Sequence, residues 1–533
     1  MTAATLAPSR DRAAALGRNP WVVAFTVTLA TFMEVLDTSI ANVALPHIAG
    51  GLSASVEEST WVLTAYLVAN GIVLPLTAWI MTFMGRKRFY MTCVALFTIS
   101  SFLCGMAPTL GTLILFRVVQ GAGGGGLQPS EQAILADTFA PEKFGMAFAV
   151  YGMAVVLAPT IGPTLGGFIT DHFDWRWIFF INLPIGIISL LLTYRVVEDP
   201  AYLKEQKRTS RSQFNVDYLG LGLVVLGLGC LQVVLDKGQE EDWLSSHLIA
   251  SLTAISVTAL VTFVFWEWRH KNPILNVRLF RRPTFAIASL MMFVLGVGLY
   301  GTTVLLPLYV QQLLGYSAQL AGMVLSPGGL ATMMMMPVVG MLVSRVQARW
   351  LVALGFGISA IAFLRMTNIN PSIDFQTAMS YRIIQSIGLA FLFIPITTIA
   401  YFGMPQRSNN QVSGIVNLSR NIGGSVGIAA VTTLVARRSQ IHQDRIAVHV
   451  NTYGHTLLNT LNAMNTMFFG KGFSHPDATR QAIGRIYQQV QMQATALAYV
   501  DTFWVLAMAS LCMLPLVFIM QKNDPRQAQV AGH

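Results

Sequence analysis

The chain has 533 residues, of which 54% are hydrophobic and only 11% are charged. A soluble domain carries about a quarter charged residues, so this composition excludes a soluble globular protein. The net charge of +10 does not require a nucleic-acid partner, because the cytoplasmic loops of membrane proteins collect Lys and Arg. The four cysteines lie in or beside apolar runs, and their spacing suggests neither a disulfide nor a metal site.

Taken in chain order, the apolar runs predict an all-α polytopic membrane protein, because each is long enough to cross a hydrocarbon core of roughly 30 Å. The first run is too long for a signal peptide and is interpreted as an uncleaved helix. Two connections are long, namely 197–215 and 437–496. The fourteen expected spans cover roughly residues 21–45, 59–83, 89–106, 109–136, 145–169, 178–196, 216–236, 247–268, 284–308, 318–343, 350–367, 377–402, 411–436 and 497–520.

The distribution of basic residues predicts that both termini are cytoplasmic. With the N-terminus inside, the segments at the cytoplasmic side hold 22 of the 34 Lys and Arg residues, whereas the short outer loops hold only Arg176 and Lys237. Positive charge gathers in cytoplasmic loops, so the opposite orientation is disfavoured. The segment 437–496 then lies outside, where long loops follow this rule only weakly.

An internal repeat predicts two bundles. The fourth span reads "FRVVQGAGGGGLQP" and the twelfth reads "YRIIQSIGLAFLFIP", each with Arg-x-x-Gln and a later proline. A shift of eight spans indicates two six-helix halves with an inserted pair, an architecture known in transporters. The expected division is a tail at 1–20, an N-terminal bundle at 21–196, a cytoplasmic loop at 197–215, the inserted pair at 216–268, a C-terminal bundle at 269–520 containing the periplasmic segment 437–496, and a tail at 521–533.

Six motifs in order along the chain carry a family resemblance. They are "LDTSIANVALP" (36–46), "RVVQG" (117–121), "GPTLGG" (162–167), "WRWIFFINLPIG" (175–186), "LPLYVQQLLGYSAQLAG" (306–322) and "NLSRNIGGSVGIA" (417–429). With these motifs the chain resembles the major facilitator superfamily, its fourteen-span drug:proton antiporters and, among these, the EmrB-type exporters of Gram-negative bacteria. The resemblance implies a multi-pass protein of the bacterial inner membrane.

One motif departs from the family pattern. The superfamily places an acidic residue in the loop between the second and third spans, ahead of a Gly-Arg-Lys sequence. Here Gly85, Arg86 and Lys87 match, but Thr82 stands at the acidic position and Ala78 at the first glycine. The sequence therefore shows no acid for the latch that closes the cytoplasmic face in other members.

Two carboxylates, Glu34 and Asp37, lie inside the first apolar span. A charged Asp at the centre of a membrane helix costs roughly 2.5–3.5 kcal/mol on insertion, so we expect the pair to face the bundle interior. Residues three apart share a helix face, and neighbouring carboxylates disfavour double ionisation. Arg117 is the expected partner of Asp37, because both lie toward the outer side and a buried guanidinium demands an acceptor. We interpret Asp37, Glu34 and Arg117 as proton-coupling residues; the alternatives are a static ion pair between helices and, for Glu34, contact with the substrate.

Glycines and a proline mark expected helix contacts. Gly162 and Gly166 are four residues apart and form a small-residue face, while Pro163 removes one helix hydrogen bond and favours a bend. Gln120 and Gly121 allow close approach and hydrogen bonding beside the arginine. The resemblance implies a role in conformational change for Gly85, Arg86, Gln120, Gly121, Gly162, Pro163, Gly166 and Gly167.

Polar residues in several spans are candidates for a substrate pocket, since intramembrane polar groups usually face a cavity. The alternative for each is a packing contact between helices. A run of methionines at 333–336 would give an adaptable apolar wall. The candidates are Asn42, Tyr66, Gln128, Tyr151, Gln385, Asn417 and Arg420.

The outer segment contains "ATRQAIGRIYQQVQMQ", in which Ile483, Ile486, Tyr487 and Val490 recur at helical spacing. This pattern predicts an amphipathic helix. The helix either caps the transporter or, as the resemblance implies, docks an EmrA-like periplasmic adaptor that leads to an outer-membrane channel.

We interpret the chain as a secondary exporter, not an enzyme, that moves protons in and amphiphilic, toxic compounds out. No Walker motif is present in the sequence, so ATP is not the expected driver, and no cofactor is expected. Two alternatives stay open. One is export of a single metabolite such as a fatty acid or siderophore, and the other is a membrane sensor or scaffold that does not transport.

Overall fold

The computed structural model describes residues 19–200, 202–203, 217–270, 273–370, 372–449 and 455–521, and these residues form helices and connecting turns. The long helices of the first half are α2 (Pro20–Gly51), α4 (Trp61–Met84), α5 (Arg86–Gly105), α6 (Leu110–Gly124), α7 (Leu127–Thr138), α8 (Phe144–His172), α10 (Asn182–Val196), α12 (Tyr218–Lys237) and α13 (His247–Arg269). The second half contains α14 (Pro283–Gln312), α15 (Ala318–Val343), α16 (Ala348–Met366), α17 (Phe375–Tyr401), α18 (Asn409–His449), α19 (His455–Phe469) and α20 (His475–Met513). Short elements connect them: α3 (Val56–Ser59), α9 (Trp177–Phe180), η1 (Pro141–Lys143), η2 (Trp243–Ser245), η3 (Val277–Arg281), η4 (Gln406–Ser408) and η5 (Pro515–Ile519).

Thirteen helical segments in the described part of the chain are long and apolar enough to cross a membrane, and each overlaps one of the fourteen expected spans. The remaining span, 411–436, lies within α18, which packs along α14 and α20 inside the helical body. Polar residues within this span lower its mean hydropathy. Two of them, Asn417 and Arg420, are buried against protein neighbours instead of facing lipid.

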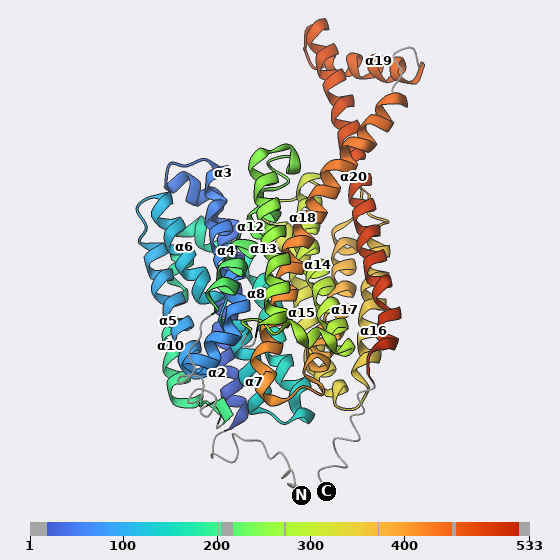
Figure 1. The fold of residues 1–533 in the computed structure, drawn as a ribbon. Coiled ribbons are helices and arrows are strands. Elements are labelled where there is room, and N and C mark those ends of the chain that lie inside the picture. Colours follow the sequence, from blue (N-terminus) through green and yellow to red (C-terminus); the bar gives the residue numbers. More distant parts are fainter. Residues whose placement is uncertain are drawn as a thin grey trace, which may run out of the picture.

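The described chain begins and ends at the same end of the helical body (Figure 1). α2 starts there and η5 finishes there, whereas α3 and the outer parts of α18 to α20 lie at the opposite end. This arrangement agrees with the expected topology, in which both termini share one side and the segment 437–496 lies on the other. The end that holds the two chain ends is called the cytoplasmic side below, following the distribution of basic residues.

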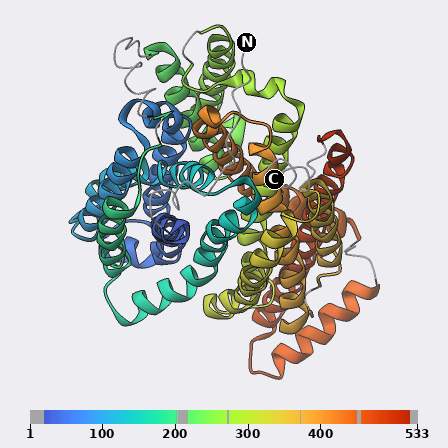
Figure 2. The same ribbon diagram turned by 90° about the horizontal axis from the view of Figure 1, so that it is seen from below.

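Helices from the two halves of the chain gather on two sides of the molecule (Figure 2). In the first half α2 packs on α8, and α6 packs on α4 and α5; in the second half α14 packs on α18, and α17 packs on α15 and α16. Contacts of α8 with α15 and of α4 with α18 join the two groups. Of the inserted pair, α12 packs against α4 and α18 and so borders the seam between the groups, while α13 packs on α12.

The segment 437–496 forms a projecting arm rather than a cap. α18 continues past the expected end of its span to His449, α19 follows, and α20 runs for 39 residues from the arm back into the body. The arm points away from the bundle (Figure 1). The expected amphipathic stripe lies in α20, where Ile483 is 54% and Tyr487 is 52% exposed. The interpretation of this helix as a cap over the transporter is therefore wrong.

Candidate functional site

The two carboxylates of α2 are both buried, with Glu34 4% and Asp37 2% exposed. α2 is helical through this region despite them, and most of its neighbouring positions are buried apolar residues. Although the two side chains lie one turn apart, they bind different partners. Each belongs to its own polar cluster.

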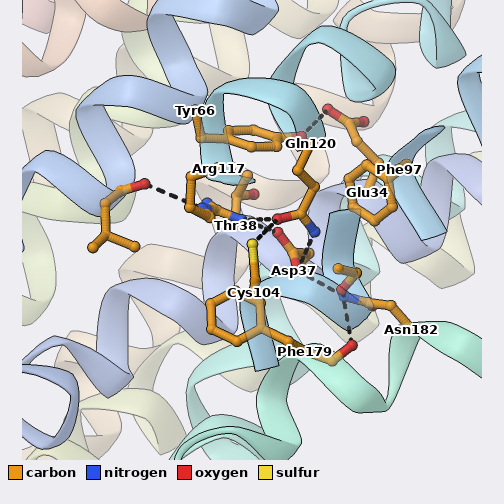
Figure 3. Close-up of polar contacts among 12 residues, drawn as sticks. Glu34, Asp37, Thr38, Tyr66, Phe97, Cys104, Arg117, Gln120, Phe179 and Asn182 are labelled. Atoms are coloured by element: carbon orange, nitrogen blue, oxygen red, sulfur yellow. Dashed lines mark hydrogen bonds and ion pairs between the residues drawn. The ribbon is translucent and has the colours of Figure 1, made fainter. Parts of the chain in front are cut away.

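The Asp37 cluster consists of Asp37, Arg117, Gln120 and Asn182 (Figure 3). Arg117 Nη1 lies 2.5 Å from Asp37 Oδ2, forming a buried ion pair between α2 and α6. The other carboxylate oxygen accepts hydrogen bonds from Gln120 Nε2 at 3.0 Å and Asn182 Nδ2 at 2.6 Å. The expected contact between Asp37 and Arg117 is thus present, and both oxygens of the carboxylate are bonded.

The guanidinium is held by more than the carboxylate. Arg117 donates from Nε to the Val62 carbonyl at 3.1 Å and from Nη1 to Gln120 Oε1 at 2.8 Å. The Tyr66 ring centroid lies 4.3 Å from the guanidinium carbon, a cation–π contact. Because desolvation of a buried ion pair costs several kcal/mol per ion, such a pair persists only when hydrogen bonds support both charges.

Asn182 was not among the residues singled out from the sequence, although it lies in one of the family motifs. It starts α10 and donates from Nδ2 to Asp37 Oδ1 and to Ser101 Oγ at 3.0 Å. The available signal was a polar residue inside an apolar run. The sequence alone does not show that this side chain reaches the first helix.

A second cluster, the central network, consists of Glu34, Tyr66, Asn70, Gln128, Gln132, Tyr151, Asn417 and Arg420. Its acid, Glu34, accepts a hydrogen bond from Gln128 Nε2 at 2.6 Å. Tyr66 Oη and Asn70 Nδ2 lie 3.3 Å from the other carboxylate oxygen. Tyr66 therefore contacts both clusters, with its hydroxyl on Glu34 and its ring on the Arg117 guanidinium.

The cation of the central network comes from the other half of the chain. Arg420 in α18 donates from Nη1 to the Tyr151 hydroxyl at 3.0 Å and from Nη2 to Asn417 Oδ1 at 3.0 Å. Its Nη2 also donates to Gln128 Oε1, so a single amide joins the guanidinium to Glu34. Helices α2, α4, α7 and α8 thus meet α18 through one continuous set of polar side chains.

Two of the expected pocket residues lie outside the central network. Gln385 bonds Arg382 Nη1 at 2.8 Å and Thr302 Oγ1 at 2.6 Å within the second half of the chain. This repeats the Arg-x-x-Gln arrangement of Arg117 and Gln120, with a threonine where the first half has Asp37. Asn42 is exposed on α2 beyond Asp37. The sequence-based grouping of Gln385 and Asn42 with the other candidates is therefore not reproduced in space.

The cytoplasmic cluster consists of Arg86, Asp137, Tyr202, Asn409 and Asn410. Arg86 Nη1 lies 2.5 Å from Asp137 Oδ2, and its Nε and Nη2 donate to Asn410 Oδ1 at 3.1 and 2.6 Å. Asn409 Nδ2 donates to Asp137 Oδ1 at 2.8 Å. The two halves are thus bonded together at this face.

The acid missing from the loop motif is supplied from elsewhere. Thr82, at the acidic position of the family pattern, donates to the Ala78 carbonyl of its own helix, while Asp137 at the end of α7 pairs with Arg86. Tyr202 donates to Asp137 Oδ2 at 2.6 Å. Burial raises the pKa of the Tyr202 phenol, so it remains a donor to the carboxylate at neutral pH.

The expected small-residue contacts are close. A Cβ on Gly121 would lie 2.3 Å from the Tyr66 carbonyl oxygen, and one on Gly162 would lie 2.3 Å from Ser39 Oγ. Gly166 faces Ile40, whereas Gly167 has nothing within 4 Å of the same position. Pro163 lies inside α8, which continues through it. Gly85 has a φ of 88° and joins α4 to α5, a conformation that L side chains rarely adopt.

Comparison with known proteins identifies the family. The model of the Major Facilitator Superfamily matches residues 27–428. The chain belongs to this superfamily. It is 36% identical over 498 residues to the multidrug export protein EmrB of Haemophilus influenzae, covering 93% of this chain and 95% of that protein. It is 35% identical over 514 residues to the fatty acid resistance protein FarB of Neisseria gonorrhoeae, covering 96% and 98%.

The fold is that of the superfamily. The proton:xylose symporter XylE has a TM-score of 0.62 with this structure at 12% identity, covering 96% of this chain and 99% of that one. The resemblance noted from the six motifs is therefore confirmed, as is the all-helical fold. The protein is a multi-pass major facilitator superfamily transporter related to EmrB-type multidrug exporters, not an enzyme.

Proposed function

We propose that this transporter is a proton-coupled antiporter that exports amphiphilic compounds by alternating access. The observation that carries the proposal is the buried Asp37–Arg117 pair, a titratable acid whose charge is matched by a permanent cation at membrane depth. A proton on Asp37 removes the charge that compensates Arg117 and weakens every bond in the cluster. Protonation is thereby coupled to helix packing.

The coupling acts through three first-half helices. Asp37 lies on α2, Arg117 on α6 and Asn182 on α10, so loss of the carboxylate charge loosens contacts among all three. Tyr66 contacts the guanidinium with its ring and Glu34 with its hydroxyl. A change at Asp37 therefore reaches the central network through one shared side chain.

We place the substrate at the central network. It is bordered by aromatic rings, since the Phe393 ring centroid lies 5.5 Å from the Arg420 guanidinium carbon and 5.6 Å from the Tyr151 ring. Met336 approaches Gly152 on the same helix as Tyr151. An amphiphile with one polar group and an apolar body suits this mixture of charge, aromatic surface and methionine.

A second candidate, export of a fatty acid, is favoured by Arg420. Within the described part of the chain this buried guanidinium hydrogen-bonds amide and hydroxyl oxygens and no carboxylate. A substrate carboxylate could replace them with a charge-assisted, bidentate contact. The similarity to FarB supports this candidate.

Alternating access requires the cytoplasmic cluster to break. Asn409 and Asn410 on α18 hold Asp137 and Arg86 of the first half, so these bonds exist only while the cytoplasmic face is closed. In the proposed cycle the bundles 21–196 and 269–520 rock against each other around the central network. The inserted pair 216–268 borders the contact between the two bundles and shifts when that contact rearranges.

We also propose an inner-membrane location and an EmrA-like periplasmic adaptor that docks on the arm and leads to an outer-membrane channel. Ile483 and Tyr487 lie one turn apart on α20 and are both exposed, so they form one apolar patch on the projecting arm, and such a patch supports an external partner. The chain's coverage of EmrB supports the location.

Uptake into inverted membrane vesicles tests the function. The probes are ethidium as a lipophilic cation, oleate as a fatty acid and Nile red as a neutral dye. A proton gradient should drive uptake of at least one probe, an uncoupler should abolish it, and Asp37→Asn should abolish it while leaving membrane insertion intact. Failure of all three probes in vesicles with correctly inserted protein would refute the multidrug and fatty-acid proposals alike. Full gradient-driven uptake by Asp37→Asn would remove Asp37 from the mechanism.

A further inference from the structure

A third carboxyl, Glu131 on α7, is buried in the first half of the chain and takes no part in the clusters described above. It is 0% exposed. The Thr28 hydroxyl of α2 donates to Oε1 at 2.5 Å, while Oε2 has no hydrogen-bond partner in the described part of the chain. An ionised carboxylate in such a place is costly unless a cation or several donors compensate it.

The cations near Glu131 are already engaged. Among the described residues Arg420 is the cation that interacts with it electrostatically, and that guanidinium is bonded to Tyr151, Asn417 and Gln128. The Arg117 guanidinium of the Asp37 cluster is already paired with Asp37. Glu131 has the hydrogen bond from Thr28, the nearby Thr31 hydroxyl and no dedicated cation, so a neutral acid that holds a proton suits this site best.

The titratable groups that face Glu131 come from several helices. Glu34 on α2 and Arg420 on α18 interact with it electrostatically, as do Tyr90 on α5 and Tyr151 on α8. Ionisation of Glu34 opposes ionisation of Glu131, because like charges at short range in a buried site repel. The protonation states of the two acids are therefore linked.

The position of Glu131 along α7 indicates the direction in which this proton moves. Gln128, one turn earlier, belongs to the central network, and Asp137, six residues later, belongs to the cytoplasmic cluster. At about 1.5 Å per residue, Glu131 lies between the two. While the bonds of Asn409 and Asn410 close the cytoplasmic face, water does not reach it from that side.

We propose that Glu131 carries a second exchanged proton, which it accepts from the central network and releases to the cytoplasm when the cytoplasmic cluster opens. The inference rests on the proposed proton antiport and extends it. One O–H bond forms at Glu131 and one breaks in each cycle, and the released proton passes to cytoplasmic water. After the cytoplasmic face has closed, Glu131 takes a new proton from the central network, so each cycle moves one proton inward.

Infrared difference spectroscopy of the purified full-length protein tests the titration without any transported probe. The carbonyl stretch of a protonated carboxylic acid is expected to disappear as the pH is raised from mildly acidic to mildly alkaline, and Glu131→Gln should lack this component. Thr28→Val keeps the carboxyl but removes its donor, so the titration should persist at a shifted pH. A Glu131 band that does not respond to pH in wild type and Thr28→Val overturns the proposal.

Proton counting in proteoliposomes tests the exchange. The number of protons moved per ethidium, oleate or Nile red molecule, whichever wild type transports, should fall by one in Glu131→Gln. Glu267→Gln is the matched control, because Glu267 on α13 is also a fully buried acid without a side-chain hydrogen-bond partner among the described residues, but it lies outside both bundles. It should keep the wild-type count. An unchanged count in Glu131→Gln overturns the proposal, whereas absence of proton movement in wild type overturns the antiport itself.

Discussion

The bonds that close the cytoplasmic face should set the balance between the two conformations of the transporter. The perturbation is the double substitution Asn409→Ala with Asn410→Ala, which removes the amides that α18 presents to Arg86 and Asp137. Neither substitution touches the Arg86–Asp137 ion pair, which lies wholly within the first half of the chain. The change therefore acts on the contact between the halves.

The magnitude follows from the geometry. Asn410 Oδ1 accepts from Arg86 at 3.1 and 2.6 Å, and Asn409 donates to Asp137 at 2.8 Å. A hydrogen bond to a charged group contributes about 1.5–3 kcal/mol net. Counting the shared acceptor once and taking the lower bound for each asparagine gives about 3 kcal/mol, which corresponds to on the order of a hundredfold shift toward the cytoplasm-open state.

Accessibility of a cysteine at Ser413 reports the shift. Ser413 is fully buried one turn beyond Asn410, so a cysteine there reacts only when the halves separate. In a background without the four natural cysteines, a membrane-impermeant maleimide added to inverted vesicles should label the double variant much faster than the parent. Asn462→Ala, on an exposed position of α19, is the control and should label at the parental rate. Equal labelling of the double variant and the parent would refute this account of the closed face.

Three further predictions concern packing, charge geometry and the arm. Gly121→Leu should lower the midpoint of thermal unfolding in detergent by several degrees, because overpacking costs typically 1–3 kcal/mol, whereas Gly167→Leu, in open space, should not. Arg117→Lys keeps the charge but loses the fork of donors, so gradient-driven uptake should fall at least about tenfold; wild-type uptake would show that charge alone suffices. Ile483→Asp with Tyr487→Asp should abolish co-purification of a periplasmic adaptor without changing uptake in vesicles; retained binding would move the docking site elsewhere.

The Asp37–Arg117 contact could be predicted because two kinds of information agreed. A carboxylate and a guanidinium in apolar spans each need a partner, and the topology placed both toward the same side. The family motifs pointed to the same residues. The structure adds two further donors to Asp37, the side-chain amides of Gln120 and Asn182. These contacts could not be predicted, because amide contacts between distant helices leave no periodic pattern in the chain.

The separation of Glu34 from Asp37 could not be predicted from their spacing. Residues three apart share a face, but a rotation of part of a turn is enough to direct one side chain to α6 and α10 and the other to α4 and α7. The partners of Glu34, including Gln128 and the Arg420 that it bridges to, come from the meeting of the two halves. Hydropathy carries no information on that meeting.

The cytoplasmic latch shows the limit of motif comparison. The acidic position of the family motif holds Thr82, so motif comparison predicts no acid beside Arg86. Asp137 nevertheless provides one from the end of α7. A carboxylate thus contacts Arg86 although it lies elsewhere in the chain than the family motif places it. The arm shows a similar limit, since α18 and α20 extend beyond the hydrocarbon region on polar sequence that hydropathy treats as a loop.

Proton movement coupled to substrate is the most direct test of the central claim. Proteoliposomes containing the purified protein and an internal pH-sensitive dye receive ethidium, oleate or Nile red without an imposed proton gradient. Wild type should move protons opposite to the transported probe, and Asp37→Asn should move fewer protons for each probe molecule than wild type. Transport by wild type without proton movement, or equal proton movement by Asp37→Asn, would contradict the account.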